Sequence, residues 1–293
     1  MRLRESTFYI ESLLTVGVIC IGFAAIFVRL AGISGTVASF YRLLIASSAL
    51  VPIWLVKGDR SISRRMAIFA VLSGICFGCD LGMWSTALFH TRAATATLLV
   101  YLAPVWVAIA ARVFLKERIR NLQWLGTATA LSGMVVIVGL RNLLEINLGF
   151  GNSIAIFASF FYAGYLLFAQ LGRSGTGTFT FTTISVVSSM VTLLVACLVR
   201  GEQMTGFSMH TWVYLFALGL VTHVTGWLSI NYALGHLKAS IVSVTLLGQP
   251  MVTAIAAIPI LGESLAPAQI AGGMLVLAGI YLVNRRIDPV SPE

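Results

Sequence analysis

Hydrophobic residues occur along this chain in ten long and nearly continuous runs, which short polar segments separate. A helix needs about 20 predominantly apolar residues to cross a hydrocarbon layer about 30 Å thick, so each run predicts one membrane-spanning helix. The apolar positions do not alternate as they would in the strands of a membrane β-barrel. The ten predicted spans cover approximately residues 12–31, 36–56, 66–88, 94–115, 122–140, 151–172, 178–199, 212–235, 239–261 and 266–284.

The composition agrees with this pattern and excludes several classes of protein. Of the 293 residues, 58% are hydrophobic and 10% are charged, whereas roughly 25% are charged in an ordinary soluble domain. A soluble enzyme, a nucleic-acid-binding module and a disordered chain are therefore excluded. Because ten spans leave on the order of eight residues for each connection, no connection can hold a soluble domain. The function must lie within the helix bundle.

The net charge of +9 predicts an orientation in the membrane. Thirteen Lys and Arg residues fall in segments on the side of the N-terminus, and only Arg92, Arg141 and Arg200 fall on the opposite side. Since cytoplasmic loops carry an excess of Lys and Arg, both termini are predicted to be cytoplasmic. We expect a multi-pass protein of the bacterial inner membrane, with the lipid bilayer as its surroundings and no nucleic acid as a partner.

The chain contains an internal repeat. The segment that begins at Ala87 aligns without a gap to the segment that begins at Ala233, with a constant shift of 146 residues. Chance matching of apolar residues does not explain His, Pro, Glu and Gln in one register. The matched pairs are His90 and His236, Pro104 and Pro250, Glu117 and Glu263, Gln123 and Gln269, Gly126 and Gly272, and Gly133 and Gly279.

This repeat predicts the architecture. Each half of the chain holds five spans, and an odd number of spans places the second half in the membrane upside down relative to the first. Residues 1–146 and 147–293 are thus expected to form two inverted repeats, related by a pseudo-two-fold axis in the membrane plane, with a site between them near the midplane. The predicted fold is an all-α integral membrane protein whose ten transmembrane helices enclose a central cavity, an arrangement that favours transport by alternating access.

Asp80 is the only carboxylate deep within a predicted span. A charge there is costly, so Asp80 should face a partner or a watery cavity. Arg42 lies at a depth that differs by only about 3 Å, at about 1.5 Å per residue. Asp80 could bind an ammonium group of the substrate or carry a coupling proton, or it could form a static ion pair with Arg42.

Aromatic and polar side chains at middle depth indicate a lined cavity, although most aromatic residues in membrane helices merely fill the bundle. Such walls suit an aromatic or large apolar amino acid, through ring stacking and cation–π contact with its ammonium group. His223 could also shuttle protons, or serve only as a packing residue. The candidate substrate-binding residues are Asp80, Trp84, Tyr101, Tyr162, Tyr165, His223, Trp227, Asn231 and Gln249.

Prolines and glycines suggest how the bundle packs and moves. Pro104 and Pro250 fall near the middle of their spans, where a proline permits a kink, so we expect them to act as paired hinges or to shape the cavity wall; they could also be harmless bends. Gly74, Gly78 and Gly82 recur every four residues and predict a face on which a neighbouring helix packs closely.

Three classes of function were weighed against this pattern. A transporter of small molecules fits best, without a cofactor, a metal or an ATPase subunit, because the chain has no Walker A motif. Proton coupling and facilitated diffusion both remain open. An intramembrane enzyme would need convergent nucleophile, base or metal ligands, and no catalytic set is recognised in the sequence. A structural or sensor protein is the third alternative, and we expect a monomer in each case.

The residues also carry a resemblance to a known family. The mid-span prolines, a Leu-x-Glu sequence at the following loop and a glycine-rich final helix occur in both halves, and this pattern resembles the EamA family of the drug/metabolite transporter superfamily. The sequence around Asp80 and the segment 100–104 (VYLAP) resemble the YddG-type aromatic amino-acid exporters. The resemblance implies a basket of ten helices that exports amino acids from the cytoplasm. Export of other small metabolites or drugs is the alternative.

Overall fold

The computed structural model describes residues 7–58, 62–91, 93–114, 117, 119–139, 149–262 and 266–285. Glu263 and the expected boundary between residues 146 and 147 lie outside these ranges. The prediction of an all-α membrane protein is confirmed, because ten helical segments within the described residues are long and apolar enough to cross a membrane. These spans are Phe8–Ala31, Gly35–Val56, Arg64–Ala87, Thr95–Phe114, Asn121–Val138, Phe150–Arg173, Thr178–Val199, Met209–Leu234, Ala239–Leu261 and Pro267–Asn284.

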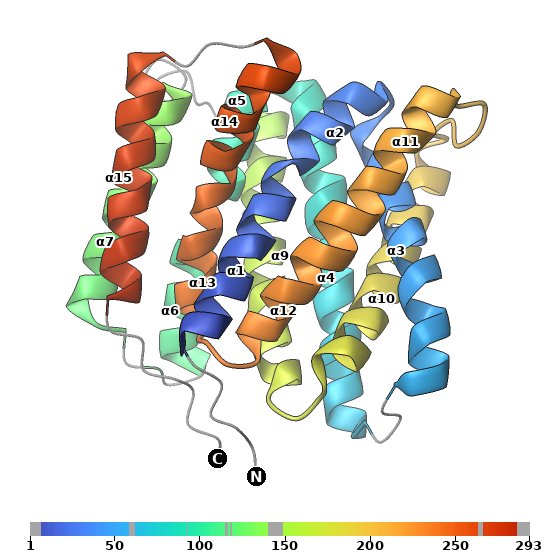
Figure 1. Ribbon diagram of the computed structural model, residues 1–293, viewed down its shortest axis with the longest axis horizontal. Coiled ribbons are helices and arrows are strands. Elements are labelled where there is room, and N and C mark those ends of the chain that lie inside the picture. Colours follow the sequence, from blue (N-terminus) through green and yellow to red (C-terminus); the bar gives the residue numbers. More distant parts are fainter. Residues whose placement is uncertain are drawn as a thin grey trace.

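Several spans consist of more than one helix. The elements in chain order are α1 (Thr7–Gly22), α2 (Ala24–Ala31), α3 (Gly35–Lys57), α4 (Arg64–His90), α5 (Ala93–Val100), α6 (Ala103–Phe114), α7 (Asn121–Val138), α9 (Phe150–Arg173), α10 (Thr178–Val199), α11 (Met209–Ala217), the π-helix η1 (Leu218–Trp227), α12 (Leu228–Leu234), α13 (Ala239–Thr245), the 3-10 turn η2 (Leu246–Gly248), α14 (Gln249–Leu261) and α15 (Pro267–Asn284). We call the side on which α1 begins and α15 ends the lower face, as in Figure 1, and the opposite side the upper face.

Side chains that follow the sequence signals for helix starts cap several of these helices. Ser63 Oγ accepts a hydrogen bond from the backbone N of Met66 at the start of α4. Gln123 accepts from the backbone N of Arg120 at 2.8 Å, before α7, and Gln269 accepts from the backbone N of Ala266 at 2.9 Å, before α15. These contacts satisfy backbone N–H groups that a helix start leaves unpaired. The two matched glutamines of the sequence repeat therefore have the same local role.

The fourth and ninth spans are interrupted at equivalent positions. The fourth span breaks at Tyr101 and Leu102, between α5 and α6, and the ninth breaks at η2, between α13 and α14. Pro104 and Pro250 each lie at the second residue of the helix that follows the break. Proline is well suited to the first turn of a helix, because the N–H that it lacks would have no partner inside the helix. This local chemistry accounts for a break at the same place in both halves.

Glycines bring two helices together at the edge of the bundle. α7 and α15 lie side by side (Figure 1), and a Cβ atom at Gly133 would lie 2.5 Å from the carbonyl oxygen of Gly272. A Cβ atom at Gly126 would lie 2.7 Å from the carbonyl oxygen of Gly279. A shift of 146 residues exchanges these two contacts with one another. Only glycine allows the two backbones to approach this closely.

Glycines of α4 serve a similar purpose against α10. A Cβ atom at Gly74 would clash with the carbonyl oxygen of Ser185, and one at Gly78 would lie 2.7 Å from Cβ of Thr192. At Gly82 the nearest atom is Cδ2 of Leu193, at 3.6 Å. α4 and α10 are therefore in tight contact around Gly74 and Gly78 and less tightly packed around Gly82, which is closer to the upper face.

Candidate functional site

A cavity of about 430 Å³ lies between the helices and extends from the middle of the bundle to the upper face. Tyr162 and Trp227 line its inner part, while Leu261 at the end of α14 and Gln269 at the start of α15 line its outer part. The volume is that of a site for a small molecule, for which about 300–1,000 Å³ is usual. Residues of α1, α2, α3, α4, α5, α7, α9, η1, α14 and α15 contribute to its wall.

Two buried charged residues of opposite sign line this cavity. Arg42 on α3 is 6% exposed, and Asp80 on α4 is 5% exposed. Asp80 Oδ1 and the Nε and Nη2 atoms of Arg42 have no hydrogen-bond partner. Within the described part of the chain no ion pair joins the two side chains, although they interact electrostatically.

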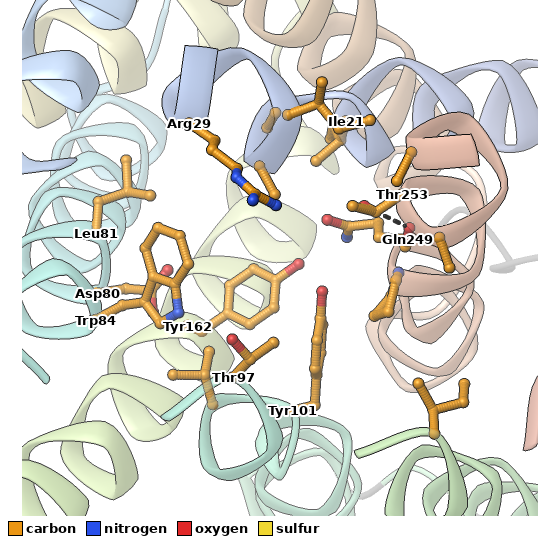
Figure 2. Close-up of a pocket in the computed structure, with 18 of the residues that line it drawn as sticks. Ile21, Arg29, Asp80, Leu81, Trp84, Thr97, Tyr101, Tyr162, Gln249 and Thr253 are labelled. Atoms are coloured by element: carbon orange, nitrogen blue, oxygen red, sulfur yellow. Dashed lines mark hydrogen bonds between the residues drawn. The ribbon is translucent and has the colours of Figure 1, made fainter. Parts of the chain in front are cut away.

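Aromatic rings form much of the remaining wall. Figure 2 shows Trp84 beside Asp80, with Tyr162 and Tyr101 facing the centre of the cavity. The Trp227 ring is 3% exposed and lies perpendicular to the Tyr162 ring, with a centroid distance of 6.3 Å. Since the rings come from four different spans, they surround the cavity and can stack against a planar apolar group from several directions.

Two polar residues of the cavity wall lie at the helix breaks. Tyr101 lies in the break between α5 and α6, and Gln249 is the first residue of α14, directly after the break at η2. Both line the cavity, as does Pro250, whereas Pro104 is buried away from it. At the first break the hydrogen bonding changes pitch, since Tyr101 N donates to the carbonyl of Thr97 whereas Leu102 N donates to that of Leu99.

Six of the nine predicted substrate-binding residues line the cavity and three do not. The six are Asp80, Trp84, Tyr101, Tyr162, Trp227 and Gln249. Tyr165, His223 and Asn231 are buried elsewhere, with exposed fractions of 2% each. His223 and Trp227 both lie on the π-helix η1 and their rings are neighbours, yet only Trp227 lines the cavity.

His223 packs against the cavity wall from behind. Its ring centroid lies 5.9 Å from that of Phe77 and 6.5 Å from that of Trp227, and both of these residues line the cavity. Neither ring nitrogen of His223 has a hydrogen-bond partner. His223 thus contacts two residues of the cavity wall and does not line the cavity itself.

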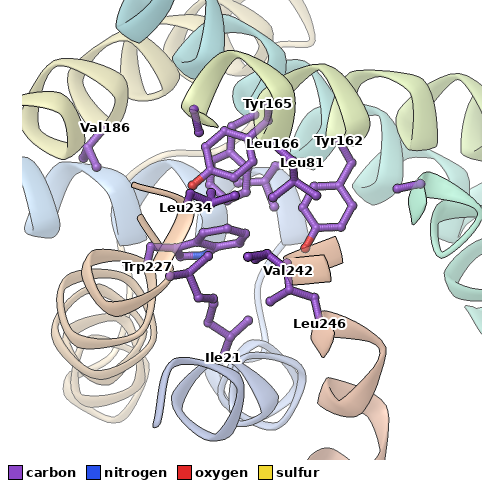
Figure 3. Close-up of a cluster of buried hydrophobic side chains, with 14 of the residues drawn as sticks. Ile21, Leu81, Tyr162, Tyr165, Leu166, Val186, Trp227, Leu234, Val242 and Leu246 are labelled. Atoms are coloured by element: carbon purple, nitrogen blue, oxygen red, sulfur yellow. The ribbon is translucent and has the colours of Figure 1, made fainter. Parts of the chain in front are cut away.

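Tyr165 and Asn231 belong to a hydrogen-bonded layer between the cavity and the lower face. Tyr165 Oη donates to Asn231 Oδ1 at 3.0 Å, and Asn231 Nδ2 donates to Thr182 Oγ1 at 3.2 Å. Arg173 Nε donates to the backbone carbonyl of Asn231 at 2.9 Å. Figure 3 shows Tyr165, Leu166 and Leu234 packed together in the hydrophobic core that accompanies these contacts.

A second set of contacts lies still closer to the lower face. Gln170 of α9 donates from Nε2 to Glu117 Oε1 at 2.8 Å, and its Oε1 accepts from the backbone N of Ala239 at 2.5 Å. Gln170 thus connects the end of the fourth span to the start of the ninth. We call these two sets together the lower seal, which consists of Glu117, Tyr165, Gln170, Arg173, Thr182, Asn231 and Ala239.

The cavity also contains residues that the sequence analysis did not select. Arg29 at the end of α2 points into it, beside Thr97 and Thr253 of its wall (Figure 2). Phe77 also lines it. Arg29 lies within a predicted span, so its charge was an available signal. Thr97 and Thr253 carry no such signal, because Ser and Thr are common in membrane helices and often bond to their own backbone, as Thr253 does to the carbonyl of Gln249.

The sequence is similar to those of a known protein family and of individual transporters. Two segments of the chain, residues 9–139 and 149–285, match the EamA-like transporter family. A probable terminal-alkyne amino-acid exporter of Streptantibioticus cattleyicolor is 28% identical, over 90% of this chain and 89% of the relative. The uncharacterized transporter YdfC of Bacillus subtilis is 23% identical, over 99% of this chain and 95% of the relative.

A solved crystal structure shares the fold. It superposes with a TM-score of 0.77 at 15% sequence identity and covers 96% of this chain and 98% of the other. The match to the family extends over both halves of the described bundle and includes all the helices that line the cavity. This chain is a multi-pass membrane transporter that belongs to the EamA-like transporter family.

Proposed function

We propose that this protein exports amino acids with aromatic or other apolar side chains from the cytoplasm, by alternating access. The observation that carries the proposal is one cavity that combines the buried carboxylate of Asp80 with the rings of Trp84, Tyr101, Tyr162 and Trp227. The carboxylate offers a partner for an ammonium group, and the rings offer surfaces on which an apolar side chain stacks.

One relative supports an amino acid as the substrate. The relative from Streptantibioticus cattleyicolor is named a probable exporter of an amino acid, and it aligns with nine tenths of this chain. The proposal is also consistent with the resemblance of the segment around Asp80 to YddG-type aromatic amino-acid exporters. Export of another small metabolite is the second candidate, and it is favoured by Arg29, since a cation near the upper face suits an anionic compound.

Features of a duplicated architecture support alternating access. Residues 1–146 and 147–293 act as two inverted repeats in this proposal, and the exchange of the glycine contacts between α7 and α15 under a shift of 146 residues supports it. The cavity reaches the upper face, while the lower seal closes the other side. Inverted repeats can adopt the opposite state by rocking about the same site, with the helix breaks beside Pro104 and Pro250 as hinges.

The orientation of the protein completes the proposal. The excess of Lys and Arg in the segments on the side of the N-terminus supports a cytoplasmic lower face in a bacterial cell. The cavity described above is then the outward-facing state. A substrate enters from the cytoplasm when the lower seal opens, and it leaves through the upper face.

Counterflow in liposomes tests the proposal. The purified protein is reconstituted with an excess of unlabelled tryptophan, phenylalanine, methionine or threonine inside, and entry of the labelled compound is followed with and without an imposed pH gradient. We expect counterflow of tryptophan, phenylalanine and methionine and little counterflow of threonine, and the gradient distinguishes proton coupling from facilitated diffusion. Absence of counterflow for all four amino acids would contradict the proposal.

A further inference from the structure

Several polar atoms of the two buried charged residues of the cavity have no hydrogen-bond partner among the described residues. Arg42 and Asp80 are each more than nine-tenths buried, yet Nε and Nη2 of Arg42 and Oδ1 of Asp80 make no hydrogen bond. A charged group inside a membrane bundle is costly unless it is paired, and such groups mark the path of a substrate or an ion. Both side chains line the same cavity, so one ligand can reach both of them.

The donors and acceptors of this pair define the ligand. A guanidinium group offers a planar set of N–H donors that matches the two oxygens of a carboxylate, and a carboxylate accepts hydrogen bonds from an ammonium group. An α-amino acid carries an ammonium group and a carboxylate on the same carbon atom. It can therefore satisfy Asp80 and Arg42 together, while its side chain extends toward the aromatic rings.

We propose that Arg42 binds the carboxylate of the substrate while Asp80 binds its ammonium group, so that the pair selects zwitterions. This inference rests on the proposed transport function. An amine without a carboxylate would leave Arg42 buried and unpaired, and an acid without an ammonium group would leave Asp80 in the same condition. A site rejects analogues strongly when they leave its buried polar groups without a partner.

The second arginine of the cavity provides a matched control. Arg29 lines the cavity from α2 but is exposed, in contrast to Arg42. Water and salt screen a charge at an exposed position, so Arg29 contributes much less to the choice between ligands. Arg29→Gln and Arg42→Gln remove the same charge from the same cavity, and they differ in burial.

The test uses three ligands that share an indole ring. Binding of L-tryptophan, tryptamine and indole-3-propionate to the purified full-length protein is measured by isothermal titration calorimetry. We expect the unaltered protein to bind L-tryptophan at least about tenfold more tightly than either analogue. In Arg42→Gln, the affinities for L-tryptophan and indole-3-propionate should fall by about tenfold or more, while the affinity for tryptamine stays within about threefold. Asp80→Asn should instead lower the affinities for L-tryptophan and tryptamine and leave the affinity for indole-3-propionate unchanged.

The outcomes separate the inference from the function on which it rests. If the unaltered protein binds none of the three ligands, the proposed export of aromatic amino acids is contradicted. If it binds L-tryptophan but Arg42→Gln lowers the affinities for L-tryptophan and tryptamine equally, the proposed role of Arg42 is overturned. The proposed function is not contradicted by that result. The same holds if Arg29→Gln alters the order of the three ligands as much as Arg42→Gln does.

A variant that fails to fold does not leave the question open. Arg42→Lys keeps the positive charge and loses the planar pair of donors, so it should retain part of the preference for L-tryptophan over tryptamine. The comparison of the three ligands on the unaltered protein needs no substitution at all. Equal affinities for L-tryptophan and tryptamine in that comparison would by themselves overturn the inference.

Discussion

The upper and lower halves of the bundle use similar polar residues in different ways. Around the cavity, atoms of Arg42, Asp80, Gln249 and Trp227 have no hydrogen-bond partner. In the lower seal, Gln170 and Asn231 each make hydrogen bonds to more than one element. Hydrogen bonds thus join several spans in the lower seal, although Oε2 of Glu117 there has no partner among the described residues, whereas the buried polar atoms named beside the cavity are left unpaired.

One helix contains both environments. Tyr162 and Tyr165 of α9 are three residues apart and their rings are nearly parallel, with centroids 6.4 Å apart. Tyr162 lines the cavity, and Tyr165 donates a hydrogen bond to Asn231 in the lower seal. The boundary between the two halves thus falls within a single turn, and substitutions on either side of it should have separable effects.

The largest effect is expected for Asp80→Asn. This change removes the buried carboxylate of the cavity without removing a hydrogen bond seen at its Oδ1 atom. Loss of one member of a buried charged contact with the substrate costs about 2–5 kcal/mol, so transport should fall by about 30-fold or more. The initial rate of counterflow in liposomes measures this loss, and size-exclusion chromatography measures the yield of folded protein. A fall in folded yield as large as the fall in transport would indicate a purely structural role.

A smaller effect is expected from alanine at the glycines of α4. Gly74→Ala introduces a Cβ atom against the carbonyl oxygen of Ser185, whereas Gly82→Ala meets only Cδ2 of Leu193 at 3.6 Å. Overpacking costs about 1–3 kcal/mol, so Gly74→Ala should lower the melting temperature by roughly 2–10 °C. Gly82→Ala should leave it within about 2 °C. Equal melting temperatures for the two variants would show that α4 is not packed more tightly around Gly74 than around Gly82.

The smallest effect is expected for the two tyrosines of α9. Tyr165→Phe removes the hydrogen bond to Asn231 and should cost about 1 kcal/mol of stability, with the affinity for substrate unchanged. Tyr162→Phe alters the cavity wall and should change substrate affinity by about threefold to tenfold, with little effect on melting. Differential scanning fluorimetry and binding titrations distinguish these results. A loss of substrate affinity in Tyr165→Phe would contradict the assignment of Tyr165 to the lower seal.

The fold was largely predictable because the bilayer constrains it strongly. Continuous apolar runs long enough to cross a membrane leave few alternatives to a helical bundle, and the ten predicted spans correspond to the ten observed ones. The sequence did not reveal that the eighth span contains the π-helix η1, since no residue type marks the change of helical pitch. It also did not reveal the break between α1 and α2 at Phe23, because a single glycine inside an apolar run, here Gly22, is usually tolerated within a helix.

The site was predictable where a charged residue lies inside a membrane span, because burying a charge there costs free energy. Asp80 and Arg42 stood out as charges inside spans, and both line the cavity. Tyr165 and Asn231 were chosen by the same reasoning on depth and polarity, but they face one another and form part of the lower seal. The sequence indicates that a polar residue lies at middle depth. Whether its partner is a ligand or another side chain depends on the packing of α9 against α12.

The most direct test of the account measures access to the cavity from the two faces. Cys20, Cys76, Cys79 and Cys197 are replaced first, and a single cysteine is introduced at Thr97, which lines the cavity. An impermeant thiol reagent is then applied to either face of oriented vesicles, with and without Gln170→Ala, which removes the contacts to Glu117 and Ala239. The account predicts reciprocal rates, with faster labelling from the lower face and slower labelling from the upper face in Gln170→Ala. Faster labelling from both faces would indicate a continuous pore and would contradict it.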